Sequence, residues 1–306
     1  MKILIATEKP FAAVAIDGMR KVIEEAGAEL VLLEKYTSKT ELLAAVADAD
    51  ALIIRSDKVD AEVMDAGKKL KVVVRAGAGY DNVDLKEATL RNICVENTPG
   101  QNSNAVAELV FGLAVMMARN MYAGTSGSEL RGKGLGIHAF GQVGRNVARI
   151  ARGFEMNISA LDPYCPEDVM LEAGVTPVHS VEELYKLNRY VSLHIPATEE
   201  TRKSVGYDLV MLMPKGGVLI NTARKEVIDE EGLIKALKER DDLKYVADVA
   251  PERAMEMKEL FGDRVFFTPK KMGAQTAEAN INAGIAAARQ AIAFLTEGID
   301  KFRVNK

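Results

Sequence analysis

Apolar and polar residues follow two different rhythms along almost the whole chain. Short, nearly continuous apolar runs are typical of strands buried on both faces, and apolar residues three or four apart are typical of helices with one buried side. The expected strands are 2–6, 29–33, 51–54 and 71–74 and, after the pattern restarts near Gly134, 135–139, 157–162, 190–195, 217–221, 244–249 and 265–267. The expected helices include 11–26, 40–47 and two long Ala-rich ones at about 101–120 and 274–297. This alternation predicts an α/β protein whose parallel sheets carry helices on both faces.

The chain has 306 residues, which is enough for two domains. Its net charge of −4 provides no basic face, so a nucleic-acid partner is not expected. Glu108 and Arg289 interrupt the longest apolar helical stretches, which argues against a membrane span. The two cysteines, Cys94 and Cys165, lie far apart, so neither a disulfide framework nor a metal site is expected. Without a signal segment at the amino end, these features favour a cytoplasmic protein.

A glycine-containing turn follows the first strand of the second series. The run Ala139–Gly144, with the sequence AFGQVG, opens the next helix. It matches the dinucleotide-binding fingerprint, with Ala in place of the first glycine. Gly141 lets a pyrophosphate approach the backbone, and Gly144 lets the helix pack closely on the strand. Gln142 and Val143 begin the helix, where backbone amides and the helix dipole favour an anion.

An acidic residue ends the following strand. Asp162 stands at about the distance from Gly144 at which such folds place an acid that bonds the adenosine ribose hydroxyls. No arginine follows it directly, which favours NAD over NADP. The alternative is that Asp162 and Pro163 only form a turn.

Three further segments carry a family resemblance. They are 75–84 (RAGAGYDNVD), 102–108 (NSNAVAE) and 221–229 (NTARKEVID). Together with the glycine turn they resemble the NAD-dependent D-2-hydroxyacid dehydrogenases, over essentially the whole chain. The resemblance implies two doubly wound domains: a Rossmann NAD-binding domain at 98–274 and a discontinuous, flavodoxin-like substrate domain at 1–97 and 275–306. It also implies a homodimer formed through the nucleotide domain.

The expected reaction needs a cation for the substrate carboxylate and a group that moves the hydroxyl proton. Arg224 is the predicted cation, because a guanidinium grips a carboxylate with two hydrogen bonds. Most of the family has a histidine as the base, but none stands between Pro269 and Gly273. Lys271 takes its place when counted back from Gly273, and Lys270 when counted forward from the proline. Lys271 is preferred as the acid/base, and Lys270 is then expected to contact the substrate.

The remaining predicted active-site contacts follow from the same resemblance. Glu252 is the nearest acid to the position of the family's third catalytic residue, although it stands one place off the usual spacing. Val106, Thr222, Ala223, Asp248 and His194 are expected at the cofactor, with His194 also an alternative base.

Substrate contacts are expected on the first domain. The backbone amides of the loop that begins at Ala76 and Gly77 are predicted to hold the substrate carboxylate. Arg55 and Ser56 end the strand 51–54 and are predicted to bind a phosphate group. The resemblance is strongest to members that oxidise 3-phosphoglycerate to 3-phosphohydroxypyruvate in serine biosynthesis and that lack a C-terminal regulatory domain. The alternatives are a glyoxylate or hydroxypyruvate reductase, and an inactive NAD-binding regulator.

Overall fold

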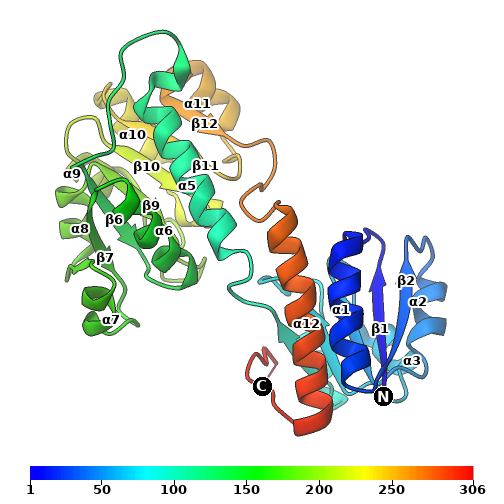
Figure 1. Ribbon diagram of the computed structural model, residues 1–306. Coiled ribbons are helices and arrows are strands. Elements are labelled where there is room, and N and C mark those ends of the chain that lie inside the picture. Colours follow the sequence, from blue (N-terminus) through cyan, green and yellow to red (C-terminus); the bar gives the residue numbers. More distant parts are fainter. Residues whose placement is uncertain (306) are drawn as a thin grey trace. The chain divides into compact units, whose positions relative to one another are not determined.

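The structure is a computed structural model that describes residues 1–305 (Figure 1). The chain divides into two compact units, Met1–Asn102 with Gln275–Lys306, and Ser103–Ala274. Each unit contains one wholly parallel sheet. Among the described residues, no helix is long and apolar enough to cross a membrane.

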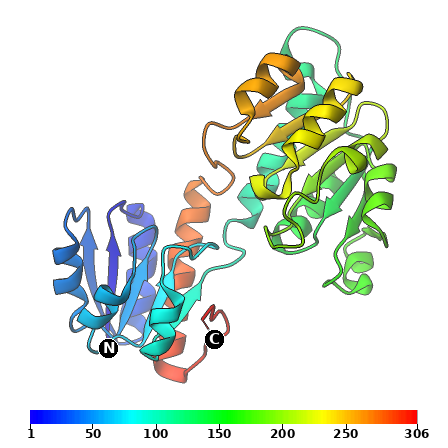
Figure 2. The same cartoon turned by 180° about the vertical axis from the view of Figure 1, so that it is seen from behind.

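The first unit is a five-stranded sheet with the order β2-β1-β3-β4-β5. Its strands are β1 (Lys2–Thr7), β2 (Glu29–Glu34), β3 (Ala51–Ile54), β4 (Val72–Arg75) and β5 (Cys94–Asn97). Its helices are α1 (Ala13–Glu25), α2 (Lys39–Val46), α3 (Ala61–Ala66), α4 (Leu85–Leu90) and α12 (Ala277–Glu297). The closing helix α12, in orange and red, lies beside α1, in blue, in both views (Figures 1 and 2). A segment from the end of the chain therefore completes the core of the unit that begins it.

Alternation along the strands divides this unit's core into two layers. Ile3, Ile5 and Val74 pack with α1 and α12, whereas Leu4 and Val73 face the opposite side. Successive strand residues point to opposite faces, and both faces are covered by helices, so both must be apolar. This explains why the strands appear in the sequence as continuous apolar runs.

The second unit is a seven-stranded sheet with the order β12-β11-β10-β9-β6-β7-β8. Its strands are β6 (Gly134–His138), β7 (Asn157–Leu161), β8 (Thr176–Pro177), β9 (Tyr190–Leu193), β10 (Val218–Asn221), β11 (Lys244–Ala247) and β12 (Val265–Phe267). Its α-helices are α5 (Ser103–Ala118), α6 (Gln142–Gly153), α7 (Glu167–Glu172), α8 (Val181–Leu187), α9 (Tyr207–Leu212), α10 (Glu230–Glu239) and α11 (Ala254–Phe261), and its short 3-10 turns are Asn120–Tyr122, Lys225–Val227 and Gly262–Arg264. Helices α5 and α6 share one apolar cluster, and α8 to α11 share the other. Helix α10, in yellow, is seen best in Figure 2.

The predicted fold class is confirmed in both units. The first sheet has the flavodoxin-like order, and the second has the Rossmann order, in which the chain reverses direction between β6 and β9. In such sheets ligands bind beyond the carboxyl ends of the strands at the reversal point.

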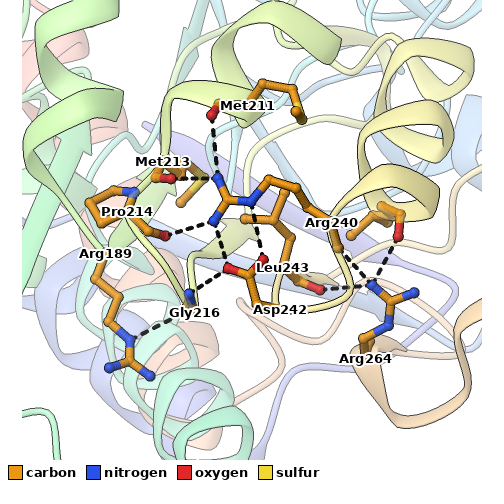
Figure 3. Close-up of polar contacts among 10 residues, drawn as sticks. Arg189, Met211, Met213, Pro214, Gly216, Arg240, Asp242, Leu243 and Arg264 are labelled. Carbon is orange, nitrogen blue, oxygen red and sulfur yellow. Dashed lines mark hydrogen bonds and ion pairs between the residues drawn. The ribbon is translucent and has the colours of Figure 1, made fainter.

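Arginines hold the loops at the opposite, amino edge of the second sheet (Figure 3). Arg240 donates to the carbonyl oxygens of Met211, Met213 and Pro214 and forms an ion pair with Asp242 at 2.6 Å. The Arg240 guanidinium holds the pKa of Asp242 down at about 2. These loops precede β10 and β11, so the cluster fixes where both strands begin.

Candidate active site

The glycine turn joins β6 to α6. Ala139 has a φ of +82°, in the left-handed region, and Gly141 is the N-cap residue of α6. A methyl group at Gly144 would lie 2.4 Å from the carbonyl oxygen of Ala139 and 3.0 Å from the side chain of Ile137. Glycine is therefore required for α6 to pack this closely. No side chain caps the first amides of α6 and no acid stands in its first turn, which leaves this terminus able to receive a phosphate.

Asp162 follows β7 and faces the glycine turn. Its carboxylate accepts hydrogen bonds from the backbone N–H of Phe140 at 2.8 Å and of Tyr164 at 2.9 Å. Each carboxylate oxygen has a second lone pair for a further donor. The structure thus places Asp162 next to the turn, with a local role in shaping it.

The end of β10 presents two cations to one oxygen atom. The carbonyl oxygen of Ala223 accepts from Nη1 of Arg224 at 2.9 Å and from Nζ of Lys271 at 3.3 Å. Asn221 shapes this turn, because its side chain accepts from the N–H of Ala223 and donates to the carbonyl of Arg224. Next to them the buried hydroxyl oxygen of Thr222 has no hydrogen-bond partner among residues 1–305. An unsatisfied buried hydroxyl at a strand end is the kind of group that a ligand completes.

Two effects lower the pKa of Lys271 from its ordinary value near 10.5. The larger is burial of the ammonium charge, and the second is the positive charge of Arg224. Asp248 and Glu226 act in the opposite direction. By its solvent-accessible surface, Lys271 as a whole is an exposed residue. The site therefore holds an amine that loses its proton more readily than an ordinary lysine.

The loop that carries Lys271 is fixed by Asp248. This buried carboxylate accepts from the Thr268 hydroxyl at 2.9 Å and from the backbone N–H groups of Met272 and Gly273, both at 2.7 Å. A methyl group at Gly273 would lie 2.8 Å from the carboxylate and 3.2 Å from Val106. Asp248 and Val106, both predicted at the cofactor, thus meet at this glycine and set the position of the lysine.

Glu252 and Lys270, both predicted at the site, make no hydrogen bond or ion pair with the Lys271 amine within residues 1–305. Glu252 has a side chain that is 78% exposed and pairs with Lys225 at 3.1 Å. Within the described part of the chain it makes no hydrogen bond or ion pair to Lys271. Lys270 is exposed. The structure therefore brings Lys271 to Arg224 and leaves Glu252 in a different ion pair.

The three histidines occupy different environments. His194 follows β9, and its Nε2 lies 3.0 Å from the hydroxyl of Ser192. Burial lowers the pKa of His194 to about 3 and that of His138 to about 4. Both imidazoles are therefore neutral at pH 7, and burial makes each a weaker base than an ordinary histidine. His179 is exposed, 3.5 Å from Glu167.

Arg55 of the first unit is held from several sides. It donates to the carbonyls of Lys9 and Pro10 and to the side chain of Asn280, and its guanidinium lies 5.2 Å from the ring centre of Phe11. Ser56 beside it is exposed.

The loop after β4 uses some of its own amides internally. The N–H of Ala76 donates to the carbonyl of Ile54 at 2.8 Å, so this amide is already used. The carbonyl of Gly77 accepts from the N–H of Thr98 at 3.0 Å. Arg75 at the end of β4 was not among the predicted site residues, although a cation at a strand end next to a glycine loop was a usable signal.

A Rossmann sheet with a glycine turn after β6 and two cations at the end of β10, two strands away, indicates a dinucleotide-dependent class of proteins. Residues 105–270 match the D-isomer specific 2-hydroxyacid dehydrogenase, NAD binding domain. The D-3-phosphoglycerate dehydrogenase of Methanocaldococcus jannaschii is 39% identical over 285 residues, which cover 88% of this chain and 54% of that protein. The chain thus spans about half the length of that relative.

For two further relatives, the match spans most of the relative's own length. The hydroxypyruvate reductase of Thermotoga maritima is 37% identical over 277 residues, or 84% of this chain and 88% of that protein. A solved NAD+-bound 3-phosphoglycerate dehydrogenase from Entamoeba histolytica is 47% identical with a TM-score of 0.84, covering 100% of this chain and 99% of that one. The chain belongs to the D-isomer specific 2-hydroxyacid dehydrogenases, a family of NAD-dependent oxidoreductases that act on CH–OH groups. The predicted family and its cofactor, NAD, are confirmed.

Proposed function

We propose that this chain is a D-3-phosphoglycerate dehydrogenase, which reversibly converts 3-phosphoglycerate and NAD+ to 3-phosphohydroxypyruvate, NADH and a proton. The observation that carries the proposal is the shared carbonyl of Ala223, which brings the Arg224 guanidinium and the Lys271 amine together at a strand end. The relatives from Methanocaldococcus and Entamoeba, both named for this substrate, support the choice within the family.

Arg224 orients the substrate. Its guanidinium still has free N–H groups besides the one that is bonded to Ala223, and these hold the C1 carboxylate. The same cation stabilises negative charge on the C2 oxygen as the carbonyl group forms or is reduced.

Lys271 moves the proton of the C2 hydroxyl. In the oxidation direction the neutral amine takes this proton as the C2–H bond breaks and its electron pair leaves with the hydrogen as hydride. In the reverse direction the ammonium returns the proton to the ketone oxygen. The lowered pKa of Lys271 makes more neutral amine available at a given pH than an ordinary lysine would supply. Asp248 contributes indirectly, by holding the loop through Met272 and Gly273.

The second unit has the groups that NAD needs. The α6 amino terminus at Gly141, Gln142 and Val143 holds the pyrophosphate, and Asp162 holds the adenosine ribose. Thr222, with its unpartnered hydroxyl, and Asp248 would contact the nicotinamide end. When bound, NAD+ supplies the hydride acceptor.

The deciding experiment follows NADH absorbance with the purified chain. 3-Phosphohydroxypyruvate is expected to support NADH oxidation, with a kcat/KM at least about tenfold above that for hydroxypyruvate or glyoxylate. A preference for hydroxypyruvate would favour the reductase alternative, which the Thermotoga relative supports. NAD binding without turnover of any of the three would favour an inactive regulator.

A further inference from the structure

A small pocket lies at the amino edge of the second sheet. It has a volume of about 220 Å³ and lies where β9, β10 and β11 begin, beside the end of α5. Its polar lining includes Asn120, Ser128, Arg189, Tyr190 and Lys244. Strand β10 runs from this pocket to the turn that carries the two cations of the proposed active site. The pocket is therefore at the opposite end of the same strands.

Arg189 brings unused hydrogen-bond donors to this pocket. Its Nε donates to the carbonyl oxygen of Gly216 at 3.1 Å (Figure 3). Its two terminal nitrogens have no hydrogen-bond partner within residues 1–305, and the half-buried side chain forms no ion pair there. A Cβ at Gly216 would lie 2.8 Å from Nη2 of Arg189, so the glycine leaves room for the guanidinium. A planar pair of N–H donors is thus available to a ligand.

Lys244 adds a second positive charge. Its Nζ donates to the carbonyl of Met117 and to the side chain of Asn120, both at 2.9 Å, which leaves one of its three N–H groups. Burial lowers the pKa of Lys244, and the charge of Arg189 lowers it further. The two cations are therefore close enough to disfavour each other.

No carboxylate among residues 1–305 forms an ion pair with either cation. Asp242, which precedes β11, instead bonds to Arg240 and to the N–H of Gly216. Like charges that are partly removed from water are unfavourable unless an anion joins them. The pocket consequently has the charge that an anionic ligand would balance.

Two hydroxyl groups lie beside these cations. Tyr190 is 1% exposed, and its hydroxyl oxygen has no hydrogen-bond partner in the described chain. Burial raises the pKa of Tyr190, while the charge of Arg189 and the neighbouring Ser128 hydroxyl act in the opposite direction. The tyrosine therefore keeps its proton and can donate it to a ligand. A buried hydroxyl without a partner is a group that a bound ligand completes.

The loop after α5 covers this pocket in an unfavourable backbone conformation. Asn120, Met121 and Tyr122 have φ values of +48°, +55° and +58°, a region that residues other than glycine adopt at an energetic cost. The Asn120 side chain holds the loop by donating to the carbonyl of Ser126 at 3.0 Å. A Cβ at Gly127 would lie 2.4 Å from a backbone carbonyl at the end of α5, so the loop packs closely there. A ligand that bonds to this loop and to the cations would stabilise it.

We propose that this pocket binds a phosphate group, held by the terminal nitrogens of Arg189, with Lys244 as the second charge and the hydroxyls of Tyr190 and Ser128 as further donors. The inference goes beyond the proposed function, because this phosphate does not react and does not occupy the position of the keto acid. Donors around two cations suit a tetrahedral dianion better than a planar carboxylate. Bound phosphate also ties the loop 120–128 to the amino ends of β9 and β11.

Hydrogen–deuterium exchange of individual peptides tests the site, with inorganic phosphate as the probe. Phosphate at about ten times its dissociation constant is expected to slow amide exchange about tenfold in residues 119–129 of the wild-type chain. Arg189→Met is expected to lose this protection. The control is Arg152→Met, which removes an exposed arginine that likewise bonds to one backbone carbonyl, and it should keep the protection. An unprotected loop in the wild type, or equal protection in Arg189→Met, would overturn the proposal.

Arg189→Lys provides a second variant that keeps the charge but lacks the planar pair of donors. It is expected to raise the phosphate concentration that half-protects the loop about tenfold, with a melting temperature close to that of the wild type without phosphate. An unchanged concentration would refute the direct contact. Acetate at the same concentration is expected to slow exchange in the loop less than about twofold. Equal protection by acetate would refute the choice of phosphate over a carboxylate.

Free phosphate and the phosphate group of a small ester share the chemistry of this pocket. Titration of loop protection with inorganic phosphate and with glycerol 3-phosphate distinguishes these two sources, because the true source gives the lower dissociation constant. Failure of both to protect the loop would overturn the site while leaving the proposed reaction unaffected, since that reaction is measured separately by NADH absorbance.

Discussion

At the scale of single residues, two cations share one acceptor at the end of β10. A lysine and an arginine both donate to the carbonyl of Ala223, although two positive charges repel each other. The repulsion and the burial of the amine act in the same direction, since both favour neutral Lys271. Lys271 therefore gives up its proton more readily than an ordinary lysine.

Lys271→Met is expected to lower kcat about 100-fold or more with little change in the KM for NAD, because the proton then has no acceptor. In the wild type, kcat for oxidation should rise with pH, since the amine must be unprotonated. Reduction should fall with pH through the same ionisation, because it needs the ammonium. The midpoint should lie below the ordinary value near 10.5. Steady-state kinetics in both directions measure these profiles, with the exposed Lys186→Met as control. Wild-type turnover in Lys271→Met, with loss in Lys270→Met, would transfer the role to Lys270.

Backbone strain at Ala139 leads to a second prediction at the residue scale. Its φ of +82° is one that glycine adopts without strain and alanine does not. Ala139→Gly should raise the free energy of unfolding by about 1 kcal/mol, as relief of strain outweighs the greater freedom of glycine in the unfolded chain. Urea unfolding measures the change. Ala148→Gly, within α6, should instead destabilise the protein by about 1 kcal/mol or more. A destabilised Ala139→Gly would show that the turn is not strained.

Among the elements, the loops at the amino edge of the second sheet depend on arginines. Arg240 satisfies three carbonyls that would otherwise lack partners, and Asp242 neutralises it (Figure 3). The same Asp242 accepts from the N–H of Gly216 at 2.7 Å. One ion pair therefore fixes the loops before both β10 and β11.

Arg240→Met should lower the free energy of unfolding by about 2 to 4 kcal/mol, because it leaves carbonyls and a carboxylate unpaired. Arg253→Met removes an exposed arginine whose side chain pairs only with Glu256 within residues 1–305, and should lower the free energy of unfolding by less than about 0.5 kcal/mol. Chemical denaturation of both variants gives the comparison. If both variants lose similarly little free energy of unfolding, water must replace the hydrogen bonds of Arg240 without penalty.

Local patterns identified most strands, but not β5 or β8. Strand β5 includes Glu96 and Asn97, whose polar side chains break the apolar run, yet both are buried. The reason lies at the far end of the chain. Glu96 accepts from the N–H of Phe302, and the side chain of Asn305 accepts from the N–H of Val95. Partners more than 200 residues away leave no trace in a short window of sequence. Strand β8 is only two residues long, too short for any periodicity.

At the scale of the whole molecule, the sequence predicted two α/β units because their helices and strands alternate throughout. Motifs also singled out the glycine turn and the pair Arg224 and Lys271, which the structure brings to one carbonyl oxygen. Motifs did not reveal that the Asp248 carboxylate accepts hydrogen bonds from the backbone N–H groups of Met272 and Gly273. This contact depends on how β11 and that loop pack. The orientation of side chains at the site is a tertiary property.

The family resemblance also predicts a homodimer through the NAD-binding unit. Light scattering after size-exclusion chromatography should give about twice the chain mass of 33.2 kDa over a range of micromolar concentrations. A single-chain mass at all concentrations would contradict this.

The lowered pKa of Lys271 has a consequence beyond the proposed reaction. A free amine is a nucleophile, so this position should be acylated faster than the other exposed lysines when the protein is treated with activated esters or anhydrides. Acylation would remove both the charge and the transferable proton at once. Peptide mass mapping after limited treatment should find this modification rising in step with the loss of turnover, and bound substrate should delay both.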